Sequence, residues 1–364
     1  MFPVLKARVR TCPQGGDMLY NPAMRIVMTD DSVPFDGYTS GHQPLGGAEK
    51  AFAALASAFA MRGHEVRAFN RCRFKMTIEG AKWEPWDQLR PLEADLLIAW
   101  RKPGLLTAVR QAAKRFLWVA APGGYLERPK NRELIEATGA RLLFQSKAHK
   151  ATFKPWTDAL PVVAAPGVRS EYQAEAAIEP AAPPLAVATT HPLHGLDWLL
   201  DLWPKIRAKV PEGRLALYSA VLDKGRQGGE VDGTIRPILD KALSLAGSGV
   251  YIERPVGDID MPGIWRKARV HLFPGHADDW LASTLMESQA SGIPAVARPL
   301  GVAPERLIDG QTGHLVPDAE AFANVAAELM NNEALFWSMS RDAKLHQASR
   351  GWDAVAGEIE GLAR

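Results

Sequence analysis

Residues 24–69, MRIVMTDDSVPFDGYTSGHQPLGGAEKAFAALASAFAMRGHEVRAF, carry the pattern that decides the fold class. Their apolar residues first form a short run at 24–28, which is typical of a buried strand. They then recur with helical spacing over residues 48–62 and form a second short run at 65–69. A strand, a loop, a helix and a second strand in this order make a βαβ unit, which predicts a parallel sheet.

The same alternation continues along the chain, on both sides of a linker rich in Ala, Pro and Glu. Further strands are predicted at residues 95–100, 115–120, 141–145, 161–165, 185–188, 214–218, 249–252, 270–274 and 294–297. Further helices are predicted at residues 196–209, 281–291 and 335–364. Two α/β halves joined by a linker predict a two-lobed protein, with the ligand site in the cleft beyond the carboxyl ends of the strands.

A chain of 364 residues is too long for one ordinary α/β core, so two domains are expected. The predicted segments are a loose N-terminal extension (1–22), an N-terminal Rossmann-like domain (23–170), a linker (171–184), a C-terminal Rossmann-like domain (185–335) and C-terminal helices (336–364). We expect these last helices to pack back on the N-terminal domain.

Composition argues against several classes of function. The formal net charge is only +2 and the basic residues are scattered, so a dedicated nucleic-acid binder is not expected. Cys12 and Cys72 have neither zinc-site spacing nor a disulfide pattern, and a reducing, cytoplasmic setting is expected. Neither a signal peptide nor a membrane-spanning run is expected. Lys147, Lys150 and Lys154 allow peripheral contact with the inner face of a membrane, although a solvated helix face explains them as well.

The loop before the first predicted helix contains two adjacent glycines. Gly46 and Gly47 let backbone amides approach an anionic or hydroxyl-bearing ligand, helped by the positive end of the helix dipole. A plain turn is the alternative. No Gly-Lys-Ser/Thr follows and no GxGxxG pattern is present, so the usual ATP and NAD motifs have little support.

The second candidate functional feature is a pair of acids, Asp279 and Glu287. Asp279 follows the predicted strand at 270–274, and Glu287 lies inside the helix predicted at 281–291. Because a helix rises about 1.5 Å per residue, acids two turns apart can face one pocket. A carboxylate accepts hydrogen bonds from both hydroxyls of a ribose, which makes Glu287 a candidate for that contact. The alternative is that Asp279 caps the helix and Glu287 is solvated.

Residues 274–317 resemble glycosyltransferase family 4, whose members are retaining enzymes of the GT-B fold. The resemblance rests on motifs in register: the pair Asp279 and Glu287, then residues 290–294 (ASGIP), 301–305 (GVAPE) and 309–313 (DGQTG). It implies two Rossmann-like domains that face each other across a deep cleft, the first holding the acceptor and the second the donor. It also implies transfer of a sugar from a nucleotide-diphosphate sugar to an acceptor hydroxyl, with retention of configuration and without cofactor or metal.

The resemblance further implies roles for single residues. Glu287 holds the donor ribose, Asp279 contacts the donor sugar, and Gly46-Gly47 lies near the donor phosphates or the acceptor. The other residues that it assigns to the donor site are Leu281, Ala282 and Ser283, at the start of the helix, and Pro255 and Val256, in the segment that cradles the base. The choice between a uridine and a guanosine donor is left open.

The chain departs from the family at two places. The first acid is Asp279 instead of the usual Glu, which shortens its reach to the sugar. The Arg and Lys that usually neutralise the donor diphosphate are missing, with Thr189 or Thr190 at the first position and His194 at the second. We expect a protonated His194 to take the Lys role, because a nearby phosphate raises the pKa of an imidazole. The alternatives are a His packed beside Trp198 and a site that binds donor without turnover.

Acceptor residues are predicted in loops of the N-terminal domain. Trp100 and Tyr125 suit stacking on a sugar ring, and Arg101 suits an acidic or phosphorylated acceptor, with a core or surface position as the alternative for each. The acceptor is left open between a glycan, a lipid-linked sugar and a small molecule. Two other functions are also left open, namely a GT-B nucleotide-sugar epimerase or phosphorylase, and a non-catalytic nucleotide-sugar binder. An epimerase needs no acceptor, and a binder shows no donor turnover.

Overall fold

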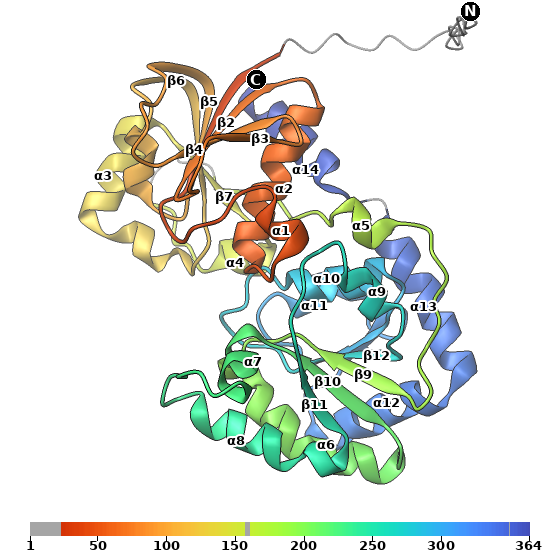
Figure 1. Ribbon diagram of the computed structural model, residues 1–364. Coiled ribbons are helices and arrows are strands. Elements are labelled where there is room, and N and C mark those ends of the chain that lie inside the picture. The colour runs from red at the N-terminus through yellow and green to blue at the C-terminus, as the bar shows by residue number, and fades with distance from the viewer. Residues whose placement is uncertain (1–22, 157–160, 349) are drawn as a thin grey trace, which may run out of the picture.

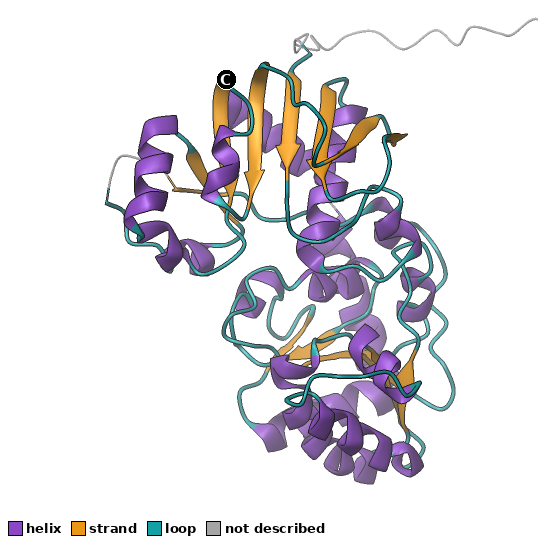
Figure 2. Ribbon diagram, turned by 60° about the vertical axis from the view of Figure 1, so that its left-hand side comes forward, coloured by secondary structure: helices purple, strands orange, loops and turns teal. Residues whose placement is uncertain are grey.

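The computed structural model describes residues 23–156, 161–348 and 350–364, so the extension predicted at 1–22 lies outside the described residues. The chain forms two α/β domains, which lie one above the other in Figure 1. Helices flank the sheet of each domain in Figure 2. The predicted α/β class with two parallel-sheet domains is confirmed.

The N-terminal domain is built on an eight-stranded sheet in the order β3-β4-β2-β1-β5-β6-β7-β8. The strands are β1 (Arg25–Thr29), β2 (Glu65–Asn70), β3 (Met76–Ile78), β4 (Ala81–Pro85), β5 (Glu93–Trp100), β6 (Gln111–Trp118), β7 (Arg141–Phe144) and β8 (Pro161–Val163). The helices and helical turns are α1 (Thr39–His42), α2 (Gly47–Met61), η1 (Pro103–Thr107), η2 (Gly123–Glu127), α3 (Pro129–Thr138) and α4 (Lys147–Ala151). The predicted βαβ unit is confirmed as β1, α2 and β2, with Arg25 paired to Glu65 in parallel register.

The C-terminal domain is built on a parallel six-stranded sheet in the order β11-β10-β9-β12-β13-β14. The strands are β9 (Leu185–Ala188), β10 (Arg214–Tyr218), β11 (Val250–Glu253), β12 (Val270–Phe273), β13 (Ala295–Ala297) and β14 (Gly313–Leu315). The helices and helical turns that follow β8 in the sequence are α5 (Ser170–Gln173), which precedes β9, then η3 (Pro192–Leu196), α6 (Asp197–Lys209), α7 (Ala220–Arg226), α8 (Arg236–Ser244), η4 (Ala246–Ser248), α9 (Met261–Trp265), α10 (Ser283–Ala290), α11 (Ala303–Arg306), α12 (Ala319–Asn331), α13 (Glu333–Ala348) and α14 (Trp352–Ala363). The strand order reverses between β9 and β12, and ligands of such sheets bind at this switch point.

The last two helices lie on different domains. Helix α13 packs against α10 in the C-terminal domain, whereas α14 packs against α2 in the N-terminal domain. Arg62 Nε and His64 Nε2, just after α2, lie 2.5 and 2.9 Å from the Glu360 carboxylate of α14. The chain therefore returns across the domain boundary after α13. Among the helices in the described ranges, none has the length and apolar character needed to cross a membrane.

Trp100 ends β5 in the core of the N-terminal domain. Its side chain is fully buried and stacks on Trp118, with ring centres 4.4 Å apart, and it meets Phe52 of α2 edge-on at 5.2 Å. The last residue of β5 points toward α2, so the ring fills the layer between sheet and helix. The prediction that Trp100 stacks on an acceptor sugar is therefore wrong.

Replacing Trp100 by alanine is expected to lower the free energy of unfolding by about 3–5 kcal/mol, because it leaves a cavity among stacked rings. Urea unfolding followed by far-UV circular dichroism measures the loss. Trp337 of α13 is partly exposed and provides the matched control, whose replacement by alanine should cost about 1 kcal/mol or less. Native stability of the Trp100→Ala protein would contradict the core position.

Candidate active site between the domains

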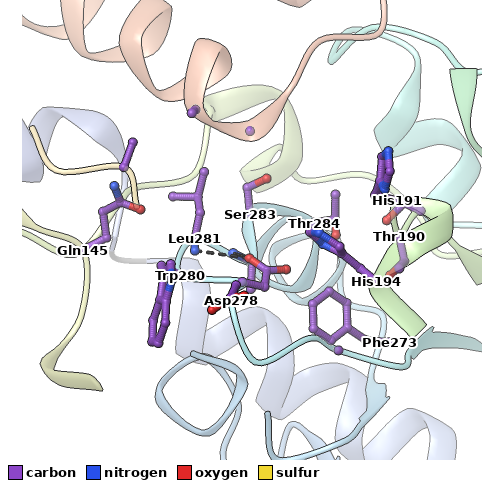
Figure 3. A pocket seen from close by; sticks show the side chains of 17 residues that line it. Gln145, Thr190, His191, His194, Phe273, Asp278, Trp280, Leu281, Ser283 and Thr284 are labelled. Carbon is purple, nitrogen blue, oxygen red and sulfur yellow. Dashed lines mark hydrogen bonds between the residues drawn. The ribbon is translucent and has the colours of Figure 1, made fainter. Parts of the chain in front are cut away.

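A cavity of about 260 Å³ lies at the switch point of the C-terminal sheet, facing the N-terminal domain (Figure 3). Its wall comes from the loop after β9, the loop between β12 and α10, and the first turn of α2. The predicted donor residues that line it are Thr189, Thr190, His194, Asp279, Leu281, Ala282, Ser283 and Gly47. The structure thus brings together residues that the sequence places in three separate segments.

Two helix N-termini meet at this cavity. Gly47 and Ala48, at the start of α2, line the cavity. Ser283 and Thr284, at the start of α10, also line it (Figure 3). Neither helix has a side-chain N-cap, so the first backbone amides of both are left to other acceptors. The positive ends of both helix dipoles favour negative charge in the space between them. The cavity is therefore suited to an anionic group.

Asp279 lines the cavity and also shapes the loop before α10. Its Oδ1 accepts hydrogen bonds from the backbone amides of Leu281 at 3.2 Å and Ala282 at 2.9 Å. These bonds hold Ala282 in the left-handed region at φ +46°, a strained conformation for a residue with a Cβ. Asp279 therefore fixes the loop before α10 without capping the helix itself, and its position in the wall keeps it available to a ligand.

The loop after β9 presents hydroxyls and imidazoles to the cavity. The side-chain oxygens of Thr189 and Thr190 are buried and have no hydrogen-bond partner in the described structure. His194 stacks on His276, with ring centres 4.6 Å apart, whereas Trp198 packs against other groups. Burial lowers the pKa of His194, and the nearby Asp279 carboxylate only partly opposes this shift. His194 is therefore neutral at pH 7 unless a ligand brings negative charge.

No Lys or Arg side chain is among the described residues that line the cavity, whereas Asp278, Asp279, His191 and His194 are. Arg298 supports the wall from behind by donating to the backbone oxygens of Pro274 and Gly275. An anionic ligand must therefore be met by amides, hydroxyls and imidazoles. Among the described residues, no three His, Cys, Asp or Glu side chains come together in a way that could hold a metal ion.

Glu287 lies one layer behind this wall. Gly47, Leu281 and Ser283 line the main cavity and also a small neighbouring cavity that contains Glu287. The Glu287 side chain is buried and paired with Lys50 of α2, whose Nζ lies 3.4 Å from its Oε1. The alternative that Glu287 is a solvated side chain is therefore wrong.

The remaining predicted site residues do not line the main cavity. Val256 packs in a core cluster below the domain boundary, and neither it nor Pro255 reaches the wall. Arg101 is paired with Glu49, in the first turn of α2, and its backbone oxygen accepts a 2.7 Å hydrogen bond from the Tyr125 hydroxyl. Gly46 precedes α2 as its N-cap residue, where a Cβ would collide with the Glu49 carboxylate. Arg101 is thus engaged by the first turn of α2 and Tyr125 by the Arg101 backbone, which explains their partial burial without an acceptor.

The wall is closed on one side by contacts between the domains. The Glu305 carboxylate accepts the backbone amides of Lys147 at 2.9 Å and Ala148 at 2.6 Å. Nearby, Trp280 stacks on His149 with ring centres 5.4 Å apart. The motif residue Glu305 therefore ties the C-terminal domain to α4 of the N-terminal domain.

Sequence reasoning missed several residues of this region. His276 and Asp278 lie between the predicted strand at 270–274 and Asp279. Their position in the loop that also carries Asp279 could have identified them as residues of the site. Lys50 directly follows the Gly-Gly-Ala-Glu loop, and Asp258 directly follows the segment assigned to the base. Nothing in the sequence indicates that these two side chains meet.

Residues 185–332 match the family model described as glycosyl transferases group 1. D-inositol 3-phosphate glycosyltransferase of Streptomyces avermitilis is 30% identical over 178 residues, which are 48% of this chain and 37% of that protein. The protein of the same name from Streptomyces coelicolor is also 30% identical over 178 residues, which are 48% of this chain and 38% of that protein. The chain thus spans less than two fifths of the length of these curated relatives.

Solved structures resemble almost the whole chain. Sucrose-phosphate synthase (tll1590) from Thermosynechococcus elongatus matches with a TM-score of 0.67 and 16% identity, over 93% of this chain and 98% of that chain. Alr3699/HepE from Anabaena, solved in complex with UDP and glucose, matches with a TM-score of 0.68 and 15% identity, over 93% of this chain and 99% of that chain. These likenesses confirm the predicted GT-B fold.

Proposed function

Because residues 185–332 match the family model described as glycosyl transferases group 1, we propose that this chain is a glycosyltransferase. In the proposed reaction, a sugar passes from a nucleotide-diphosphate sugar to the hydroxyl of an acceptor. The observation that supports this most directly is the cavity between two uncapped helix N-termini, with Asp279 in its wall and Glu287 behind it. Alr3699/HepE, with the same fold, was solved in complex with UDP and glucose.

In the proposed complex, the donor diphosphate lies against the first amides of α10 and α2. The unpartnered hydroxyls of Thr189 and Thr190 donate to its oxygens, and His194 supplies a positive charge when protonated. Negative charge grows on the diphosphate as the bond to the sugar breaks. Amides and hydroxyls that are already oriented stabilise this charge without reorganising, which is the largest single contribution in many enzymes.

The donor sugar is placed beside Asp279, whose Oδ1 holds the loop while the rest of the carboxylate faces the sugar hydroxyls. The acceptor oxygen attacks the anomeric carbon on the face from which the diphosphate leaves, and a leaving phosphate oxygen takes the hydroxyl proton. One C–O bond forms, one breaks, and configuration is retained. This step needs neither a metal nor a cofactor. Turnover measured in excess chelator tests the independence of a metal. Proton NMR of the anomeric centre in the product tests the retention of configuration.

The acceptor binds on the N-terminal domain in this proposal, and its chemistry is a glycan, a lipid-linked sugar or a small molecule. Trp100 is excluded from this role by its burial, and Arg101 is engaged by Glu49. If the acceptor is lipid-linked, the exposed Lys147, Lys150 and Lys154 supply a peripheral contact with the membrane surface. Vesicle co-sedimentation at low and high salt tests that contact.

A thermal-shift panel tests the donor site first. UDP, GDP, ADP, TDP and their sugars are added to the wild type and to Glu287→Ala, since a ligand that binds only the native state raises Tm. We expect one base to stabilise the wild type and to lose its effect in Glu287→Ala. Nucleotides that shift neither protein, or that shift both equally, would contradict the proposed donor site.

A non-catalytic nucleotide-sugar binder is the second candidate. It is favoured by one observation, the lack of Lys and Arg among the described lining residues. Such a binder would show the same Glu287-dependent thermal shift but would release no free nucleotide from the sugar donor over hours. A nucleotide-sugar epimerase would convert the donor without any acceptor, which the same assay with product chromatography detects.

A further inference from the structure

A cluster of buried ionisable side chains crosses the boundary between the domains, beside the proposed donor site. Lys50 comes from α2 of the N-terminal domain, Tyr172 from α5, Asp258 from the loop after β11 and Glu287 from α10. The elements α2, α5 and α10 come together where the domains meet in Figure 1. The side chains of Lys50, Asp258 and Glu287 are only 14%, 1% and 8% exposed.

The Lys50 ammonium is the centre of this cluster. It forms an ion pair with Asp258 Oδ1, lies 3.4 Å from Glu287 Oε1 and lies 3.5 Å from the Tyr172 hydroxyl. The Tyr172 hydroxyl donates to Asp258 Oδ1 at 2.5 Å. A single ammonium thus bridges two buried carboxylates of the other domain.

The net shift of the Glu287 pKa is upward, and Lys50 opposes it. Burial raises its pKa, Lys50 lowers it, and Asp258 raises it again. Burial by itself lowers the pKa of Lys50, but Glu287 and Asp258 outweigh burial, so the net shift is upward and the ammonium stays charged. Arg169, whose Nε is 3.9 Å from Asp258 Oδ2, is shared with Glu171 and Glu79 and cannot replace Lys50. Among the described residues, Lys50 is therefore the cation in direct contact with Glu287.

We infer that Lys50 is a positioning residue of the donor site, which holds Glu287 as an oriented carboxylate from the opposite domain. The inference rests on the proposed function, because only a nucleotide donor gives Glu287 a ribose to bind. A carboxylate accepts two hydrogen bonds from a ribose, whereas the protonated acid accepts them less well and must donate its own proton.

The arrangement also couples the donor site to domain closure. The loop that carries Asp258 is joined to the N-terminal domain by backbone hydrogen bonds from Asp258 N to Ser40 O at 2.9 Å and from Ile259 N to Gly41 O at 3.1 Å. Because Lys50 belongs to α2, its contact with Glu287 depends on the two domains being docked as they are in this structure.

The first test needs no ligand. Urea unfolding of Lys50→Met, Glu287→Gln and the double variant is measured at pH 6 and pH 8. Without Lys50, the folded-state pKa of Glu287 lies further above its unfolded value, so stability is lost as pH rises. Lys50→Met should therefore have a lower urea midpoint than the wild type, more so at pH 8, and Glu287→Gln should restore part of it. If the two changes are simply additive, the inference is overturned.

The second test measures nucleotide affinity at pH 6 and pH 8.5 by calorimetry with UDP, GDP, ADP and TDP as probes. Lys50→Met should weaken binding relative to wild type about tenfold at pH 6 and clearly less at pH 8.5, because each pH unit changes the ionised fraction up to tenfold. Lys50→Arg should recover part of the loss. Lys82→Met removes an exposed ion pair with Glu65 and serves as the control, with wild-type affinity expected.

The outcomes separate the inference from the proposed function. Glu287-dependent nucleotide binding that Lys50→Met leaves unchanged at both pH values overturns the positioning role and keeps the glycosyltransferase proposal. Lack of nucleotide binding to the wild type removes the proposed function and this inference with it. A pH-dependent loss in Lys50→Met, with recovery in Lys50→Arg, supports both.

Discussion

Replacing Asp279 by alanine is expected to lower kcat/KM for donor turnover by about 100-fold or more, the usual cost of removing one oriented polar group from a transition-state site. Two losses combine in this variant. The carboxylate no longer faces the donor sugar, and Leu281 and Ala282 lose the acceptor that fixes their amides. Without that acceptor, the left-handed Ala282 is free to relax, and the start of α10 moves. Release of nucleotide from the sugar donor measures the effect.

Asp279→Asn separates these two losses. The amide oxygen of Asn still accepts the loop hydrogen bonds, so the protein should keep wild-type Tm and nucleotide affinity while turnover falls. Asp278→Ala is the matched control, because Asp278 is an exposed acid one residue away in the same wall. Wild-type turnover in both Asp279→Ala and Asp279→Asn would show that the Asp279 carboxylate does not contact the transferred sugar.

Most of the fold is predictable from the sequence because its signals are local. The apolar runs and helical spacing of β1, α2 and β2 lie within one segment, and so does the acid pair before and inside α10. The hairpin β3–β4 was missed, since its strands are short and turn at Glu79 and Gly80, both at positive φ. Strands this short contain too few residues for an alternation of apolar and polar side chains to be recognised.

The candidate site is predictable only in part, because it depends on how the domains dock. Thr189, His194 and Asp279 were identified since each stands in a motif at a strand end. The pair between Lys50 and Glu287 joins residues 237 apart in the sequence, and only the docked domains bring them together. The prediction for Trp100 is wrong for a related reason. An aromatic residue at a strand end faces either the core or the cleft, and the periodicity of the sequence does not decide which.

The second large effect that we expect is a pH-dependent donor affinity carried by His194. Burial lowers the pKa of this imidazole in the free protein, and a diphosphate beside it raises the pKa, so donor binding takes up a proton. Affinity should therefore be highest at low pH and fall between pH 6 and pH 8, by about tenfold at most, because each pH unit changes the protonated fraction up to tenfold. The groups that face His194 are Asp279, His276, His191 and Asp278.

A nucleotide sugar is the right probe, because both of its phosphates are esterified and do not titrate between pH 6 and pH 8. Calorimetry in two buffers of different ionisation enthalpy counts the protons taken up on binding. His194→Ala should weaken binding at pH 6, leave it nearly unchanged at pH 8 and abolish the proton uptake, whereas His346→Ala, on the surface of α13, should behave as wild type. Lys50→Met is likewise expected to lose more affinity at pH 6 than at pH 8.5, so urea unfolding without ligand, in which Lys50 is coupled to Glu287, separates the two residues. A pH profile that survives in His194→Ala would mean that another group neutralises the diphosphate, and the stacked His276 is then the next residue to replace.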